Sequence, residues 1–250
     1  MGNTYQKSYQ LVTANLQVLM NSEMNCLVLL SPAGLGKTTA ILSAVKQLGL
    51  QKDVHFGYYN SYFTPLSFYQ TLIKATELQK PRLLILDDVE LILKDKTIIN
   101  LLKAATWENE KGYRTVNYNS THHSVKAHQS INFDGKIILL LNEIPEENAM
   151  FRAILDRVLF TQLVFSRDEI FSLMKDEILP KDYKGLSLQK KQKAIDFIRR
   201  HASQDTKLSF RTLIKVFNNM LYAPDKWIEL SLPILGNKPE VKKLNNNSLL

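Results

Sequence analysis

Residues 29–39, which read LLSPAGLGKTT, decide the fold that this sequence predicts. They begin in an apolar run typical of a buried strand and lead into a pattern typical of a helix. At such a junction, glycines let backbone N–H groups curl around an anion, a lysine reaches the β and γ phosphates, and the next hydroxyl binds Mg²⁺. The stretch therefore predicts a nucleotide-binding loop. Its expected members are Ser31, Pro32, Ala33, Gly34, Leu35, Gly36, Lys37, Thr38 and Thr39.

Within this loop we expect Lys37 to contact the phosphates and Thr38 to be a metal ligand. The loop departs from the full pattern at its first position, where Ser31 stands in place of glycine. The alternative is a strand-to-helix turn that binds nothing. The apolar run before the loop and the helical pattern after it favour nucleotide binding.

A second apolar run, 83–86, ends in two carboxylates, Asp87 and Asp88. At the end of a neighbouring strand, one carboxylate binds Mg²⁺ through water and the next orients or deprotonates an attacking water in phosphoryl transfer. We expect Asp87 to be the metal residue and Asp88 the general base, with Glu90 as a reserve candidate. The alternative is an acidic loop that caps the following helix.

Short apolar runs alternate with helical patterns up to about residue 165, which predicts a parallel sheet covered by helices on both faces. The fold class is therefore α/β. The expected strands are 26–30, 54–59, 83–86, 137–141 and 160–165. The expected helices are 38–48, one opened by Thr64 and Pro65, 96–108 and 146–157.

After Ser166 the pattern is helical throughout, so we expect an α/β nucleotide-binding domain at 1–166, a helical lid domain at 167–223, and a packed segment with a tail at 224–250. The net charge of +8 has its origin in the lid, because residues 181–220 hold ten Lys or Arg against three Asp. Such a patch is an electrostatic footprint for nucleic-acid phosphates or, alternatively, a solvated helix face.

The composition is that of a globular protein, with 45% hydrophobic and 22% charged residues. The single cysteine, Cys26, excludes an internal disulfide and a multi-thiolate zinc site. No apolar run approaches the roughly 18 residues that cross a bilayer, and the first residues lack the apolar stretch of a signal peptide. We expect a cytoplasmic protein that does not enter membranes.

Taken together, these motifs resemble those of the AAA+ ATPase family, and three further positions carry the resemblance. Asn142 ends the run 137–141 and is similar to the family's first sensor, which helps to position the hydrolytic water. Arg157 ends a helix before the last strand, like the arginine finger that reaches the γ phosphate of a neighbouring subunit, with Arg152 as the alternative. Arg211 opens a helix of the predicted lid, as the second sensor does.

The resemblance covers residues 10–222 and implies a P-loop parallel sheet of the AAA+ type with a small C-terminal helical lid. It also implies ATP and Mg²⁺ as cofactors, ATP hydrolysis, and a homo-oligomeric ring or open ring that is hexamer-like. A narrower similarity, to AAA+ ATPases of phages and plasmids, rests on the Asp87-Asp88 pair and on the stretches 114–118 and 131–136.

Between the helix at 96–108 and the strand at 137–141, the chain makes an excursion that predicts a β-hairpin, 113–118 pairing with about 129–133. Residues 111–128 contain cations and histidines but no acid. Hairpins at this place in DNA-handling relatives project into the ring pore, so we expect DNA contacts from Arg114 and Lys126, or from the basic lid. A hairpin with a purely structural role is the alternative.

The expected function is therefore ATP hydrolysis coupled to work on DNA, as in mobile-element replication, helicase loading or a DNA motor. A second hypothesis is remodelling of a protein partner, and a third is a small-molecule P-loop kinase. The sensor and finger candidates, Asn142, Arg157 and Arg211, argue against the kinase, which does not need them in this order.

Overall fold

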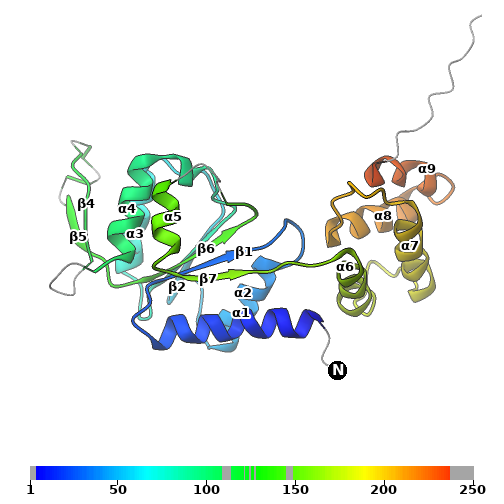
Figure 1. Cartoon of the computed structure of the whole chain (residues 1–250), viewed down its shortest axis with the longest axis horizontal. Coiled ribbons are helices and arrows are strands. Elements are labelled where there is room, and N and C mark those ends of the chain that lie inside the picture. The colour runs from blue at the N-terminus through cyan, green and yellow to red at the C-terminus, as the bar shows by residue number, and fades with distance from the viewer. Residues whose placement is uncertain are drawn as a thin grey trace, which may run out of the picture. The chain divides into compact units, whose positions relative to one another are not determined.

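The computed structural model describes residues 4–108, 114–120, 122–123, 125–126, 128–144 and 149–236 (Figure 1). It divides into two compact units, Met1–Val164 and Phe165–Leu250. The first unit is an α/β layer structure and the second is helical, so each is described in turn. No helix among the described residues combines the length and apolarity that crossing a membrane requires.

A five-stranded sheet forms the centre of the first unit, and all its pairings are parallel, which confirms the expected fold class. In spatial order its strands are β2 (Phe56–Tyr59), β3 (Leu83–Asp87), β6 (Lys136–Leu141), β1 (Cys26–Leu30) and β7 (Leu159–Gln162). The strand predicted to reach residue 165 ends at Gln162, because its neighbour β1 ends at Leu30 and leaves nothing further to pair with. The strand order places β6 between β1 and β3.

Helices cover both faces of the sheet (Figure 1). One face carries α1 (Thr4–Asn21) and α2 (Lys37–Gln47), and the other carries α3 (Pro65–Thr76), α4 (Lys96–Thr106) and α5 (Ala149–Leu155). A 3₁₀ turn, η1 (Ile92–Lys94), precedes α4. The side chain of Thr64 caps α3 as expected, accepting from the N–H of Ser67. Helix α1 was not among the expected helices, and its Val12, Leu16 and Leu19 are buried at helical spacing.

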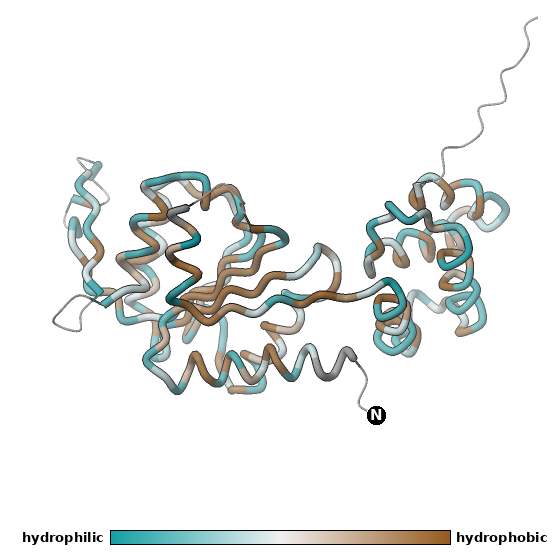
Figure 2. Tube along the Cα trace, in the orientation of Figure 1, coloured by the Kyte–Doolittle hydropathy of each residue, from teal (hydrophilic) through white to brown (hydrophobic). Residues whose placement is uncertain are grey.

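The strands of the sheet are mostly hydrophobic, whereas hydrophobic and hydrophilic residues alternate along the helices (Figure 2). Alternate residues of each strand point to opposite faces, so one set joins the core beneath α3, α4 and α5. Val28, Leu84, Ile137 and Leu139 belong to that set and are fully buried. Because both faces are buried, the loops at the ends of the strands are the part of this sheet open to a ligand.

The predicted hairpin is confirmed: β4 (Thr115–Asn117) pairs antiparallel with β5 (Ser130–Asn132). It is anchored to the helical layer, because the Tyr69 hydroxyl of α3 lies 2.7 Å from the carbonyl oxygen of His128 and 3.3 Å from that of Val116. Val116 and Val125 are buried in the same core as α3 and α4. The described part of the hairpin therefore packs on the domain.

The described part of the second unit is helical, as the sequence predicts. It contains α6 (Arg167–Leu173), a π-helical turn η2 (Met174–Ile178), α7 (Leu188–His201), α8 (Phe210–Tyr222), α9 (Trp227–Ser231) and a 3₁₀ turn η3 (Pro233–Leu235). Serine side chains cap α6, α7 and α8 by accepting a backbone N–H three residues on. Trp227 is buried, with its ring 4.8 Å from that of Phe197, so α9 packs into this unit.

Candidate nucleotide-binding site

The loop between β1 and α2 has the backbone geometry of an anion-binding turn. Gly34 and Gly36 adopt φ of 78° and 89°, in the left-handed region that residues with a side chain rarely adopt. Gly36 is the residue that precedes α2, and no side chain caps that helix. The first backbone N–H groups of α2 therefore lack side-chain acceptors, and the positive end of the helix dipole faces the loop.

Lys37 joins the loop to the ends of two neighbouring strands. Its side chain is buried, with the residue 6% exposed, and its Nζ donates to Asn142 Oδ1 at 2.6 Å and to Asp88 Oδ1 at 3.2 Å. Asn142 follows β6 and Asp88 follows β3, so residues far apart in sequence meet at the carboxyl edge of the sheet. Three of the predicted site residues are thus in direct contact.

Asp88 is held in a strained backbone conformation, with φ of 53°. Its Oδ1 accepts from Asn142 Nδ2 at 2.8 Å, and its Oδ2 has a long contact of 3.5 Å with Asn60 Nδ2. Partial burial alone would raise the pKa of Asp88. The hydrogen bond from Asn142 and the charge of Lys37 outweigh that effect and hold the pKa below its ordinary value. Asp88 is therefore a carboxylate at neutral pH.

Asp87 has the arrangement that a magnesium site needs. Its Oδ2 accepts from Thr38 Oγ1 at 2.7 Å and from the Tyr58 hydroxyl at 2.6 Å. Its Oδ1 is buried and has no hydrogen-bond partner among the described residues. An unpaired buried carboxylate oxygen beside a threonine hydroxyl fits a hydrated Mg²⁺, which prefers oxygen ligands and retains water. Thr38 and Asp87 therefore form a donor set suited to that ion.

Glu90 was the reserve candidate for the general base, but its hydrogen bond indicates a different role. Its Oε1 accepts the backbone N–H of Asn142 at 2.5 Å, which fixes the end of β6 next to Asp88. Asp88, in contrast, contacts both Lys37 and Asn142 directly through its side chain. The geometry thus favours Asp88 over Glu90 as the candidate base.

Three residues near this site were missed by sequence reasoning: Tyr58 and Asn60, from the end of β2, and Tyr9 of α1. The Tyr9 hydroxyl donates to the carbonyl oxygen of Leu35 at 2.6 Å and so ties the loop to α1. A signal existed for Tyr58 and Asn60, because both stand at the carboxyl end of an expected strand, where Asp87, Asp88 and Asn142 also lie. Nothing in the sequence marks Tyr9.

Arg157 lies at the opposite edge of the sheet from the loop, just before β7 begins at Leu159. Its guanidinium stacks on the Trp107 ring, with Cζ 3.6 Å from the ring centroid, and donates to the Ala153 carbonyl at 3.3 Å. The alternative, Arg152, is exposed on α5. A strand rises about 3.3 Å per residue, so the five residues of β1 separate the two edges by roughly 16 Å. Arg157 cannot reach the Lys37 site of its own chain.

Arg211 lies in the first turn of α8 and is exposed. It belongs to the second unit, so its contribution to nucleotide binding stays a prediction.

The prediction that Arg114 contacts DNA is wrong. The residue is 8% exposed, and its guanidinium donates to the carbonyl oxygens of Ala105 at 2.9 Å and Gly135 at 2.6 Å. It therefore holds the end of α4 and the loop before β6 together. Lys126 is exposed, as a contact residue must be.

In the basic helical unit, Lys191 is likewise structural, because its Nζ donates to the carbonyl oxygens of Leu179 at 2.6 Å and Lys181 at 2.9 Å. Its neighbours Lys190 and Lys193 are exposed. The cations available on α7 are thus fewer than the sequence count indicates.

Comparison with solved structures finds similar folds. RuvB from Thermotoga maritima, a Holliday junction branch migration motor, matches at 15% identity and a TM-score of 0.50, over 92% of this chain and 68% of that chain. A variant of the same protein matches at 12% identity and 0.52, over 92% and 69%. AMPPCP-bound DnaA from Aquifex aeolicus matches at 14% identity and 0.49, over 89% of this chain but only 64% of that chain.

No protein-family model and no curated protein matches the sequence. The likeness to RuvB, at low identity, concerns the fold. It agrees with the five-stranded parallel sheet, the helices on both faces and the helical second unit described above. The chain has the fold of the AAA+ P-loop ATPases.

Proposed function

We propose that this chain binds ATP with Mg²⁺ in the loop before α2 and hydrolyses the terminal phosphate. The observation that carries the proposal is the meeting of Lys37, Asp88 and Asn142 beside a helix N-terminus without a side-chain cap. Phosphoryl transfer needs little covalent help from a protein; it needs charge and positioning, which this group supplies.

In this proposal the loop residues 31–39 surround the phosphates with backbone N–H groups, and Lys37 turns from Asp88 and Asn142 to the β and γ phosphates. A lysine shared between a carboxylate and an amide gains charge neutralisation by moving to a triphosphate. Thr38 and Asp87 would hold Mg²⁺, which neutralises phosphate charge when bound. Tyr58 would keep the Asp87 carboxylate in place.

Asp88 and Asn142 are the proposed water-handling pair. When Lys37 leaves, Asp88 keeps the hydrogen bond from Asn142 at Oδ1. Its Oδ2, with only the 3.5 Å contact from Asn60, remains able to accept a hydrogen bond from water. Glu90 acts as a positioning residue in this scheme, because it fixes the backbone of Asn142.

The position of Arg157 supports an oligomer. Since it lies at the far edge of the sheet, it cannot contact a nucleotide bound at the Lys37 site of its own chain, whereas it can contact one bound at that site in another copy. We therefore propose a homo-oligomeric ring or open ring, hexamer-like, in which Arg157 of one copy completes the site of the next and Arg211 contributes from the lid. A group supplied in trans is worth about 10³-fold or more in related phosphoryl transfer.

We propose DNA as the target of the ATP-driven work, in mobile-element replication, helicase loading or a DNA motor. The support is the positive charge of the helical unit, together with the fold shared with RuvB, a branch migration motor. Lys126, Lys190 and Lys193 are among the exposed cations that favour phosphate contact. The burial of Arg114 weakens the case for the hairpin and leaves the lid as the better candidate surface.

The test is an ATPase assay with and without single- and double-stranded DNA, run beside a mass measurement with and without nucleotide. We expect turnover that Lys37→Ala abolishes, nucleotide-dependent assembly, and stimulation by DNA. Stimulation by a protein partner and not by DNA would favour the remodelling function. Phosphate transfer to a small molecule instead of water would favour the kinase.

A further inference from the structure

Trp107 ends α4 with half of its surface exposed, an unusual place for the largest side chain. It contributes little to the core. One face of its indole ring carries the guanidinium of Arg157, whose Cζ lies 3.6 Å from the ring centroid. The contact joins the end of α4 to the turn before β7, two segments about fifty residues apart in sequence.

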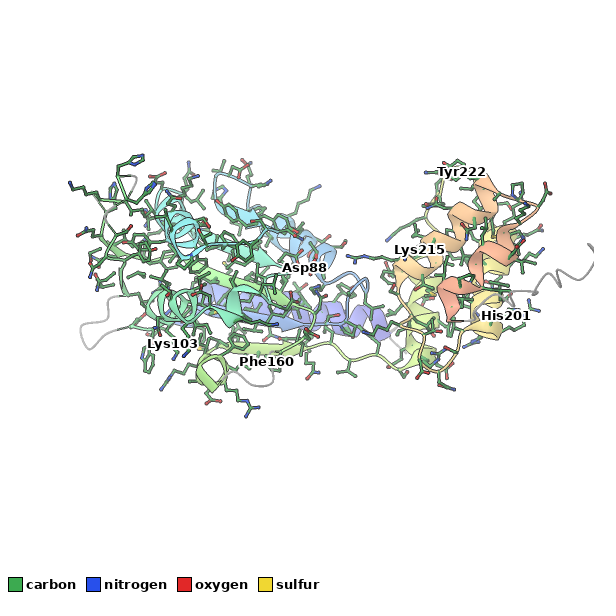
Figure 3. All side chains as sticks on the ribbon, turned by 90° about the horizontal axis from the view of Figure 1, so that it is seen from above. Asp88, Lys103, Phe160, His201, Lys215 and Tyr222 are labelled. Atoms are coloured by element: carbon green, nitrogen blue, oxygen red, sulfur yellow. The ribbon has the colours of Figure 1, made fainter. Side chains whose placement is uncertain are left out.

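The pair lines a cavity of about 310 Å³ at the amino edge of the sheet, together with Glu23, Asn25 and Lys103. Figure 3 shows the labelled Lys103 and Asp88 apart from one another in the first unit, Asp88 at the carboxyl end of β3 and Lys103 on α4. The cavity is therefore distant from the chain's own nucleotide-binding loop. Whatever Arg157 binds comes from outside the chain.

The geometry of the stack leaves Arg157 ready to bind an anion. A guanidinium stacks through its flat face and donates hydrogen bonds in its plane, so the indole occupies none of the donors. One donor reaches the Ala153 carbonyl at 3.3 Å. Within the described part of the chain, no carboxylate lies within 4.0 Å of this guanidinium. The carboxylates that line the same cavity, Glu23 and Glu108, therefore make no ion pair with Arg157, and its in-plane donors stay available to an anion.

We propose that Trp107 is a positioning residue, which holds Arg157 in the orientation that contacts the nucleotide phosphates of a second copy of this chain. The inference rests on the proposed function, because it needs the ring in which Arg157 acts in trans. A free arginine samples many rotamers, and the stack limits them before the two copies meet. The gain is one of preorganisation.

A second copy is the occupant that the charges favour. The chain carries its phosphate-binding loop at the carboxyl edge of the sheet and its stacked arginine at the amino edge. Copies that associate head to tail bring these two edges together in a heterologous interface, and repetition of that contact generates a ring or an open helical assembly. A triphosphate supplies the anion that Arg157 lacks within its own chain.

The test exploits the fact that each kind of subunit contributes only one half of an active interface. Subunits with Lys37→Ala supply the finger, and subunits with Arg157→Ala supply the working loop, so a mixture of the two restores turnover. Trp107→Leu is then placed on one kind of subunit or on the other. Trp107→Tyr, which keeps an aromatic face, is the matched control.

We expect Trp107→Leu on the finger-supplying subunit to lower the restored turnover about two- to fivefold, the range of an exposed cation–π contact. The same change on the loop-supplying subunit should have no effect, and Trp107→Tyr should retain most of the activity in either place. Thermal unfolding of each variant shows whether the fold is intact.

An equal loss from both placements would overturn the inference, because a purely structural role does not depend on which subunit is changed. Unchanged turnover with Trp107→Leu on the finger-supplying subunit would also overturn it. If Arg157→Ala alone has no effect on turnover, the proposed trans action itself is wrong. That outcome separates a failure of the proposed function from a failure of the role of Trp107.

Discussion

Replacement of Tyr58 by phenylalanine removes the hydroxyl that lies 2.6 Å from Asp87 Oδ2 and leaves the ring in place. In the structure Oδ2 accepts from Tyr58 and Thr38, while Oδ1 is buried without a partner. If Thr38 turns to the metal, Tyr58 becomes the remaining described donor to this carboxylate. Without it, Asp87 no longer presents Oδ1 in a fixed direction to metal-bound water.

The size of the effect follows from the type of bond. A hydrogen bond to a charged acceptor contributes about 1.5–3 kcal/mol, and loss of a residue that orients a metal ligand weakens metal affinity about 10- to 100-fold. Tyr58 is only partly buried, so we expect the lower end, about tenfold. The assay is binding of a fluorescent ATP analogue as a function of Mg²⁺ concentration. A parallel titration of the analogue in EDTA measures metal-free binding, and its affinity should be the same for Tyr58→Phe and the parent protein.

The effect should be independent of pH over the range used for such assays. Burial, then the hydrogen bond to Asp87, raises the pKa of Tyr58 from about 10 to about 12. The neutral hydroxyl is therefore favoured in the folded state. The contribution of the protonated Tyr58 hydroxyl to the free energy of unfolding is complete below pH 10 and is lost as the pH rises towards 12.

Tyr59→Phe is the matched control, since Tyr59 is adjacent, partly buried and makes no hydrogen bond to the described residues through its hydroxyl. An unchanged Mg²⁺ dependence in Tyr58→Phe, together with a loss in Asp87→Asn, would refute the role given to Tyr58. An unchanged dependence in both would show that Asp87 does not serve the metal.

The other expected outcomes concern cations. Arg114→Ala should lower the free energy of unfolding of the first unit by about 2–4 kcal/mol in urea, because it leaves two backbone carbonyls without their donor. A variant with parental stability but weaker DNA binding would contradict the structural role of Arg114. The double change Lys190→Ala with Lys193→Ala should leave stability unchanged. It should make the slope of the logarithm of the DNA-binding constant against the logarithm of salt concentration shallower by about two. Lys191→Ala should instead lower the melting temperature, and the reverse ranking would show that Lys191 is available to DNA.

Much of the site could be predicted because it stands at the ends of apolar strands. Lys37, Asp87, Asp88 and Asn142 each follow such a run, and a parallel sheet brings the carboxyl ends of its strands to one edge. The strand order that places β6 between β1 and β3 could not be obtained from local patterns, because pairing is decided between segments far apart in sequence.

Side-chain direction was the main source of error. Arg114 was expected to be exposed because it stands in a polar, basic excursion. Its long side chain instead reaches back to the carbonyls of Ala105 and Gly135. Lys191 was counted with its neighbours, although it lies on the inner face of α7. A charge count does not distinguish a cation on the surface from one that satisfies buried carbonyls.

Helix α1 was missed although Val12, Leu16 and Leu19 stand at the spacing of an amphipathic helix. Tyr58 and Asn60 were missed because a strand end with neither carboxylate nor lysine does not by itself indicate phosphate or metal chemistry. The contacts of Tyr58 and Asn60 with Asp87 and Asp88 depend on β2 pairing with β3, and this pairing is known only from the structure.

The proposed function requires Asp88 as the base of ATP hydrolysis, and turnover by Asp88→Asn measures this requirement. Asparagine tolerates the left-handed backbone conformation of this position, so the fold should survive. We predict that the variant binds ATP as the parent does, since Lys37 and the loop are intact, and that turnover falls to background. Hydrolysis at the parent rate would rule out Asp88 as the base, because the group that activates water would then lie elsewhere.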